Sequence, residues 1–161
     1  MQIIPAVLAT SEKQYRSDIT KLRQSGSFEE SWVHIDFADN IFVQNKTIDP
    51  RIVKDFPINL RKEAHLMVAR PKEWIEKLVD AGFERIIFHI EAEDNTQEVI
   101  KDIKIKGLEV GLAINNETPV EKLEPFRDRI DVILIMTIVP GFQGQPFIPE
   151  ALDKVKEIKS K

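Results

Sequence analysis

Two imidazole side chains and one carboxylate stand near the ends of two consecutive predicted strands. His34 and Asp36 are two residues apart, so on a strand both side chains point to the same face. His65 follows at the end of the next predicted strand, and neighbouring strands lie only about 4.8 Å apart. This donor set suits zinc, iron, manganese or cobalt. The alternative is a group of hydrogen-bonded polar residues that closes the mouth of a barrel.

The segments that must position these residues alternate along the whole chain between short apolar runs and longer amphipathic ones. The predicted strands are residues 3–8, 32–37, 61–67, 85–90, 109–114 and 132–136. The predicted helices are residues 11–24, 49–56, 71–81, 96–106, 119–126 and 149–159. Six β/α units in strict alternation predict a parallel sheet covered by helices, and nearly apolar strands fit burial on both faces.

Two α/β architectures fit this alternation, a doubly wound sheet and a β/α barrel. A dinucleotide-binding sheet has a glycine fingerprint after its first strand, and residues 9–12 contain no glycine. The polar residues instead follow several different strands, as they do in a barrel. Because TIM barrels usually need about 250 residues, the sequence predicts a single domain, residues 1–161, that forms an incomplete TIM-type barrel with about six β/α units.

Composition excludes several classes of function. With a formal net charge of -4, the chain lacks the basic surface that nucleic-acid binding requires, so we expect no nucleic-acid partner. Cysteine is absent, which removes disulfides, thiolate metal sites and a cysteine nucleophile. No apolar run approaches the ~20 residues of a membrane span, and the N-terminus has no basic leader. We therefore expect a cytoplasmic protein without membrane contact.

Several motifs, taken together and in order, resemble those of the ribulose-phosphate 3-epimerase family. The residues that carry the resemblance are 34–45, 65–68, 88–92, 111–119 and 136–145. They are distributed over almost the whole chain. The resemblance implies a TIM barrel that interconverts ribulose 5-phosphate and xylulose 5-phosphate.

The resemblance also implies roles for the residues considered first. His34, Asp36 and His65 would bind one divalent metal per chain (zinc, iron, manganese or cobalt), and Asp36 would also be a catalytic acid/base. A proton next to the ketone is removed from one face, the metal stabilises the enediolate, and a second acid returns a proton from the opposite face.

The loop of residues 140–145 would be the substrate lid, since glycines give backbone freedom and exposed amides can approach a phosphate. Met67 and Met136 are expected to line the pocket beside it. The loop residues expected to contact substrate are Gly141, Phe142, Gln143 and Gly144. An ordinary glycine-containing turn is the alternative for this loop. His89 and Glu91 share a strand face, and a structural hydrogen-bonding role is the favoured interpretation for both.

Other features depart from the family pattern. The family's second catalytic aspartate, which is also its fourth metal ligand, lies on a seventh strand, whereas this sequence predicts six. Gln44 and Gln143 stand where the family motif has proline and glycine. Activity is therefore expected to be weak or absent unless oligomerisation or another chain completes the site. The alternative function is a catalytically inactive, epimerase-like protein for metal or sugar-phosphate binding or for assembly.

The edges of a six-stranded sheet need a cover, because they expose unpaired backbone groups and apolar side chains. A homodimer or larger homo-oligomer is favoured; a closed six-stranded barrel and a separate completing polypeptide are the alternatives. A sugar-phosphate aldolase or decarboxylase is a further alternative; those enzymes require a lysine at a strand end inside the barrel mouth, and Lys62 lies early in its strand.

Overall fold

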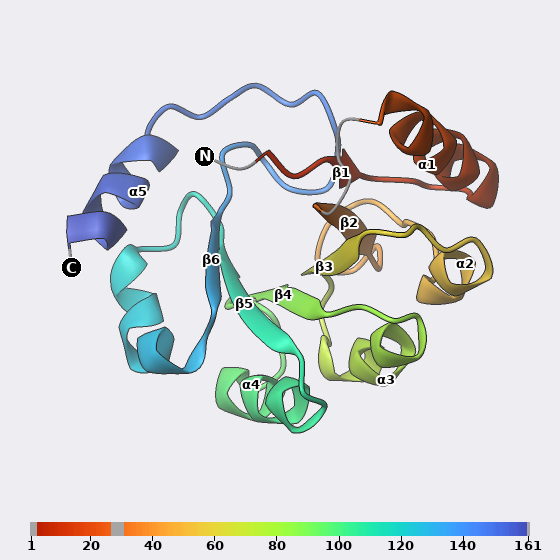
Figure 1. Ribbon diagram of the computed structural model, residues 1–161. Coiled ribbons are helices and arrows are strands. Elements are labelled where there is room, and N and C mark those ends of the chain that lie inside the picture. The colour runs from red at the N-terminus through yellow and green to blue at the C-terminus, as the bar shows by residue number, and fades with distance from the viewer. Residues whose placement is uncertain (1–2, 27–30, 161) are drawn as a thin grey trace.

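The computed structural model describes residues 3–26 and 31–160. Six parallel strands form one sheet in sequence order, and the sheet curls into an incomplete barrel with helices around its outer face (Figure 1). The strands are β1 (Ala6–Val7), β2 (Trp32–Ala38), β3 (Arg61–Met67), β4 (Arg85–His89), β5 (Glu109–Ile114) and β6 (Val132–Ile135). The helices are α1 (Glu12–Ser25), α2 (Pro50–Asp55), α3 (Lys72–Asp80), α4 (Thr96–Ile105), the 3₁₀ helix η1 (Val120–Arg129) and α5 (Ala151–Ser160). The expected architecture of six β/α units with parallel strands is confirmed.

Capping residues set the starts of the helices. The Ser11 hydroxyl accepts a hydrogen bond from the backbone of Gln14 at the start of α1, and Asp49 caps α2 in the same way through Arg51. Asn95 caps α4. These local signals explain why the predicted helix boundaries agree with the structure to within a few residues.

Alternate residues of each strand face two different environments. In β2, the side chains of Val33, Ile35 and Phe37 belong to the main hydrophobic core between the sheet and the helices. The intervening residues His34 and Asp36 face the interior of the curl, as the period of two along a strand requires. The strands are therefore apolar on their helix side, whereas the interior side of β2, β3 and β4 carries polar and charged groups.

Two elements differ from expectation. The first strand was expected at residues 3–8 but is confined to Ala6–Val7, because it lies at the sheet edge beside β2 alone and Pro5 has no N–H to donate. The segment expected as a short helix at residues 119–126 is a longer 3₁₀ helix that contains Pro125, which cannot donate the hydrogen bond that an α-helix needs there.

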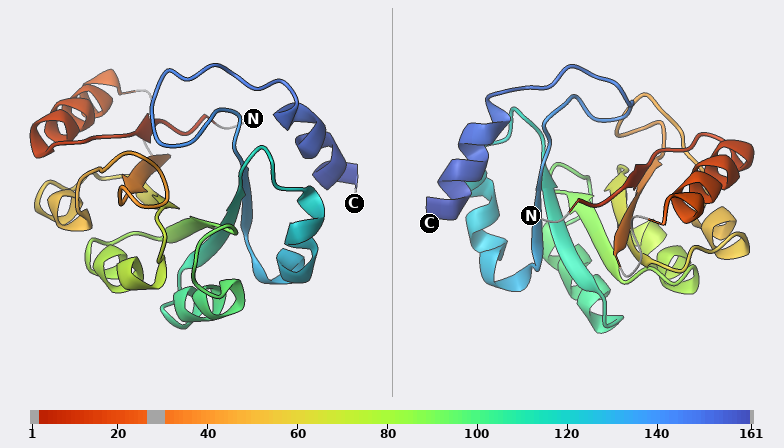
Figure 2. Two further views of the ribbon diagram at one scale, coloured as in Figure 1. Left: turned by 180° about the vertical axis from the view of Figure 1, so that it is seen from behind. Right: turned by 45° about the horizontal axis from the view of Figure 1, so that its top comes forward.

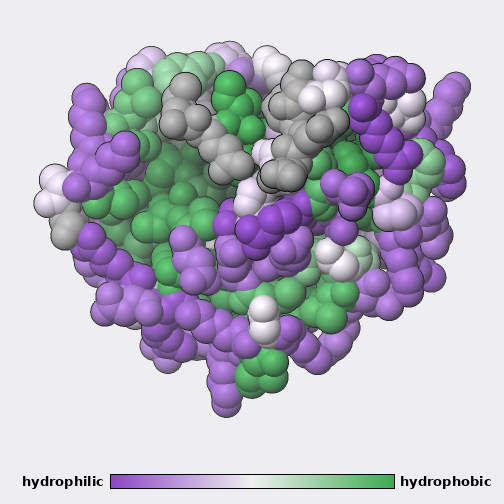
Figure 3. Space-filling view, viewed as in Figure 1, coloured by the Kyte–Doolittle hydropathy of each residue, from purple (hydrophilic) through white to green (hydrophobic). Residues whose placement is uncertain are grey.

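The sheet stays open between β1 and β6, which do not pair in the described part of the chain. The closed six-stranded barrel is therefore excluded. All four residues of β6 are only half-buried, and Figure 3 shows hydrophobic residues gathered on the side where Figure 1 places this strand. The large hydrophobic side chains exposed in and after this region include Val139, Phe142, Phe147 and Leu152.

The segment after β6 crosses this open side before it reaches α5 (Figure 2). Helix α5 then packs beside β6 and η1. The Lys154 ammonium anchors it by donating hydrogen bonds to the backbone carbonyls of Asn115, at 2.9 Å, and of Thr118. Among the described residues, the helices are all too short or too polar to cross a membrane.

Candidate active site

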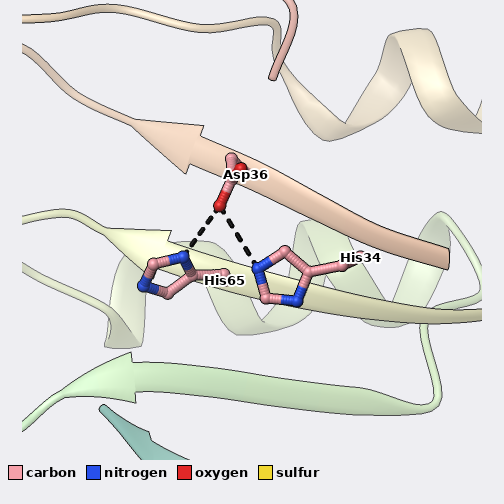
Figure 4. Close-up of side chains that lie close together, drawn as sticks. All are labelled: His34, Asp36 and His65. Atoms are coloured by element: carbon pink, nitrogen blue, oxygen red, sulfur yellow. Dashed lines mark hydrogen bonds and ion pairs between the residues drawn. The ribbon is translucent and has the colours of Figure 1, made fainter. Parts of the chain in front are cut away.

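The three predicted metal ligands converge inside the curl of the sheet. One oxygen of Asp36, Oδ1, lies 2.8 Å from Nδ1 of His65 and 3.3 Å from Nε2 of His34 (Figure 4). One ligand atom from each residue lies within 4.8 Å of the other two. Two imidazole nitrogens and a carboxylate oxygen at this spacing are a suitable donor set for a divalent transition metal.

The pairing register of β2 and β3 brings these residues together. Asp36 is opposite His65 in the parallel ladder, and His34 is opposite Glu63 two residues earlier. All four side chains point to the same side of the sheet because they are spaced by two along each strand. The site is therefore built on two central strands of the sheet rather than on loops.

Each imidazole also has a hydrogen-bonding partner at its other nitrogen. Nδ1 of His34 lies 2.7 Å from Glu63, whose second oxygen accepts a hydrogen bond from Arg85 at 2.6 Å. Nε2 of His65 lies 2.9 Å from Nε2 of His89, and Nδ1 of His89 lies 3.2 Å from Glu91. The hydrogen-bonding role expected for His89 is therefore observed, and its partner is a candidate metal ligand.

Burial and neighbouring charges set the protonation of these groups. Burial lowers the pKa of His34, but the carboxylates of Asp36 and Glu63 outweigh it and raise that pKa to about 9. Burial raises the pKa of Asp36, but hydrogen bonds and charge from His34 and His65 hold it well below its usual range. Burial lowers the pKa of His65 to about 4, only partly opposed by Asp36. At neutral pH, Asp36 is therefore an ionised carboxylate, the form that binds a cation.

The donor set opens into one pocket of about 390 Å³. All nine residues predicted for the site line it: His34, Asp36, His65, Met67, Met136, Gly141, Phe142, Gln143 and Gly144. Residues of β1 and β6 complete its walls, so the pocket lies beside the open edge of the sheet. Asp36 is the one carboxylate among the described residues of this lining. The same lining contains no described lysine, which disfavours the aldolase or decarboxylase alternative.

The loop after β6 forms part of the pocket wall. Gly141 is buried and has a φ of 110°, a conformation that side-chain-bearing residues rarely adopt. A Cβ atom at this position would lie only 3.1 Å from the Cβ atom of Val43. Glycine is therefore required here both by the backbone and by the close approach of the loop after β2. The next three residues, Phe142 to Gly144, are exposed.

The sequence motifs did not indicate two residues next to the donor set, Glu63 and Arg85. Glu63 is only 4% exposed, and its pKa is lowered, since His34 and Arg85 outweigh the opposing effect of burial. The sequence does contain a signal for Glu63: it is a charged residue two positions before His65 on a buried strand, so the two side chains lie on one face of the sheet. A buried charge needs a partner, and the partner's identity depends on the strand register.

Comparisons with known proteins agree with the motifs. A sequence model described as "Ribulose-phosphate 3 epimerase family" matches residues 2–161. The ribulose-phosphate 3-epimerase of Schizosaccharomyces pombe is 38% identical over 165 residues, covering 99% of this chain and 71% of that protein. The cytoplasmic isoform of Oryza sativa subsp. japonica is 33% identical over 166 residues, covering 99% and 72%. The epimerase of Escherichia coli (strain K12) is 35% identical over 160 residues, covering 98% and 70%.

Proposed function

We propose that this chain, which belongs to the ribulose-phosphate 3-epimerase family, binds one divalent metal ion through His34, Asp36 and His65 and acts on ribulose 5-phosphate and xylulose 5-phosphate. The observation that supports this most directly is the meeting of two imidazoles and a carboxylate in one pocket. Zinc, iron, manganese and cobalt all suit such donors.

The chemistry of the donors fits a metal ion better than a purely structural cluster. Three potential ligand atoms lie close together, and in each imidazole the nitrogen that faces away from Asp36 already has a separate partner. That arrangement is typical of metal-binding histidines, which hold their second ring nitrogen in a hydrogen bond. When bound, a divalent cation supplies positive charge that stabilises negative charge on the substrate oxygens.

Asp36 is the proposed catalytic base. Its carboxylate is ionised at neutral pH, the state that a base requires, and its place in the pocket beside both imidazoles would let it accept the proton from the carbon next to the ketone. Met67 and Met136 contribute an apolar wall, while residues 141–144 provide backbone amides and a lid over the substrate. Exclusion of water by this lid would strengthen every charge interaction within the pocket.

Inversion at the carbon requires a second acid on the opposite face of the substrate. The described pocket lining contains no carboxylate besides Asp36. We therefore propose that turnover depends on an acid from outside these pocket residues, contributed across a homodimer or larger homo-oligomer interface. The half-buried strand β6 and the exposed hydrophobic side chains beside it support such an interface. A cytoplasmic location is part of the same proposal.

The test is an epimerase assay with ribulose 5-phosphate on metal-loaded protein, with the mass in solution measured on the same sample. Turnover is expected to require the metal and to come from an oligomer. Asp36→Asn should abolish it, while Asp39→Asn is a matched control, because Asp39 accepts backbone hydrogen bonds from Ile41, Phe42 and Ala69 outside the donor set. Unchanged turnover in Asp36→Asn would contradict the assigned role.

The second candidate is a catalytically inactive epimerase-like protein that retains binding of metal or sugar phosphate. The single pocket carboxylate favours it. A folded oligomer that binds metal stoichiometrically but does not convert ribulose 5-phosphate would support this function instead.

A further inference from the structure

We infer that Glu63 and the pair His89 and Glu91 are positioning residues that determine which ring nitrogen of each histidine faces the metal. His34 would use Nε2 and His65 would use Nδ1. The inference rests on the proposed metal site and deepens it. It assigns a role to three buried or half-buried residues that lie outside the donor set and do not line the pocket among the described residues.

On the His34 side, the assignment follows from the chemistry of Glu63. A carboxylate can only accept a hydrogen bond, and Oε1 of Glu63 lies 2.7 Å from Nδ1 of His34. The ring therefore carries a proton on Nδ1. A histidine that binds a metal is neutral, and the lone pair of His34 would then be on Nε2, the atom that lies 3.3 Å from Asp36. Arg85 holds Glu63 in this orientation through the second carboxylate oxygen.

On the His65 side, a chain of two histidines performs the same task. Nδ1 of His65 lies 2.8 Å from Asp36, and Nε2 lies 2.9 Å from Nε2 of His89. Without a metal, Nδ1 donates its proton to the Asp36 carboxylate. With a metal in place of that proton, the proton of the neutral ring would lie on Nε2 and be donated to His89. His89 then carries its own proton on Nδ1, which lies 3.2 Å from the carboxylate of Glu91. Each hydrogen bond in this chain thus joins one donor to one acceptor.

Glu91 is itself held in place from the next strand. Its Oε1 atom accepts hydrogen bonds from the backbone N–H of Asn115, at 2.9 Å, and from the hydroxyl of Thr118. His89 is fully buried, so its two ring nitrogens depend on protein partners rather than on solvent. The chain from Asp36 through His65 and His89 to Glu91 therefore extends from the donor set on β2 and β3 to the end of β5.

The opposite use of the two rings has a geometric origin. His34 lies two register positions before Asp36, and His65 lies directly opposite Asp36. The same carboxylate oxygen is therefore approached by the far nitrogen of one ring and by the near nitrogen of the other. The remaining nitrogens therefore meet partners at different places on the next strand: Glu63 lies directly opposite His34 on β3, whereas His89 lies on β4 two residues beyond Ile87, the residue opposite His65.

Zinc affinity and histidine tautomers test the inference. Zinc affinity is measured by competition with a chromophoric chelator, and the coordinating nitrogens are identified from ¹⁵N shifts of the zinc-loaded protein. His89→Leu and Glu63→Leu are expected to weaken zinc binding by roughly 10- to 100-fold. His89→Gln and Glu63→Gln, which keep an oxygen acceptor, should recover most of the loss. Phe42→Leu is the matched control, because Phe42 packs on the His89 ring at 4.8 Å between centroids without taking part in the chain.

The outcomes separate the two proposals. If the parent protein binds no zinc, both the metal site and the positioning roles are wrong. If it binds zinc through Nε2 of His65, or if the leucine variants bind zinc as tightly as Phe42→Leu, the positioning roles alone are wrong. Should His89→Leu fail to fold, as judged by near-ultraviolet circular dichroism, the tautomer of His65 in the parent protein still decides the question.

Discussion

The side-chain amide of Asn45 donates a hydrogen bond to the backbone carbonyl of Gly141, at 2.6 Å and across 96 residues of sequence. It joins the loop after β2 to the loop after β6 at Gly141, a residue that lines the candidate pocket. Val43 packs against Gly141 in the same place. The two loops therefore support one another on the side where β1 and β6 leave the sheet open.

Removal of this link should loosen the proposed lid. A hydrogen bond of this kind is worth about 0.5–1.5 kcal/mol, so Asn45→Ala is expected to speed backbone hydrogen exchange in residues 141–145 by roughly two- to tenfold. Gln44→Ala, a change of the exposed neighbouring residue, is the control. Equal exchange in the two variants would show that Asn45 does not hold the loop.

Metal binding should stabilise the fold, because the donors are brought together only in the folded chain. Zinc at 100 times its dissociation constant is expected to add about 2.7 kcal/mol to the free energy of unfolding. Thermal unfolding with and without a chelator measures this. The double variant His34→Ala with His65→Ala should lose both bound zinc and the shift, and retention of stoichiometric zinc would rule out these ligands.

A single methyl group at Gly111 should destabilise the interior of the sheet. A Cβ atom there would lie 2.7 Å from Cγ1 of Ile87 on the neighbouring strand β4. Gly111→Ala is therefore expected to cost about 1–3 kcal/mol in chemical denaturation. In the double variant with Ile87→Ala, the cost should be smaller than the sum of the two single changes. Strict additivity would indicate that the two residues do not crowd one another.

Glu91 should contribute stability that is lost in acid. Burial raises its pKa, but hydrogen bonds from His89, Thr118 and the Asn115 backbone outweigh this and lower it from 4.5 to about 2. A lowered folded-state pKa stabilises the fold above the unfolded value, and this stabilisation disappears as the pH falls from about 4.5 to about 2.

The variant Glu91→Gln should therefore be less stable than the parent protein at pH 7. The expected loss is roughly 1–2 kcal/mol after allowance for solvent screening of a half-buried carboxylate. Urea titrations at a series of pH values measure the difference, which should shrink between pH 4.5 and pH 2. Glu93→Gln, at an exposed site, is the control. A difference that stays constant down to pH 2 would contradict this account.

Lys154 should anchor α5 to the rest of the fold. Its ammonium donates to two backbone carbonyls, and hydrogen bonds of charged groups are worth about 1.5–3 kcal/mol. Lys154→Met is expected to lower the free energy of unfolding by a value in that range. Lys156→Met removes only an exposed pair with Asp153 and should cost much less. Similar losses in both variants would argue against the anchor.

Local patterns in the chain were enough to predict much of the architecture. Periodicity and capping residues predicted six β/α units, and the bounds of β3 and β5 agree with the structure without adjustment. Spacing by two placed His34 and Asp36 on one face, and the resemblance of the motif around Gly141 to the family implied that the loop after β6 would lie beside them. These features depend on neighbours along the chain, so short sequence segments already contain the information.

The tertiary fold determined the contacts that depend on strand register and the properties of the strands at the edges of the sheet. The contacts of His34 with Glu63, of His65 with His89, and of Asn45 with Gly141 join residues 24 to 96 positions apart. Strand propensity does not specify such contacts, because a shift of the register by one residue would send each side chain to the other face. The shortness of β1 and the partial exposure of β6 likewise follow from their places at the open edges of the curled sheet.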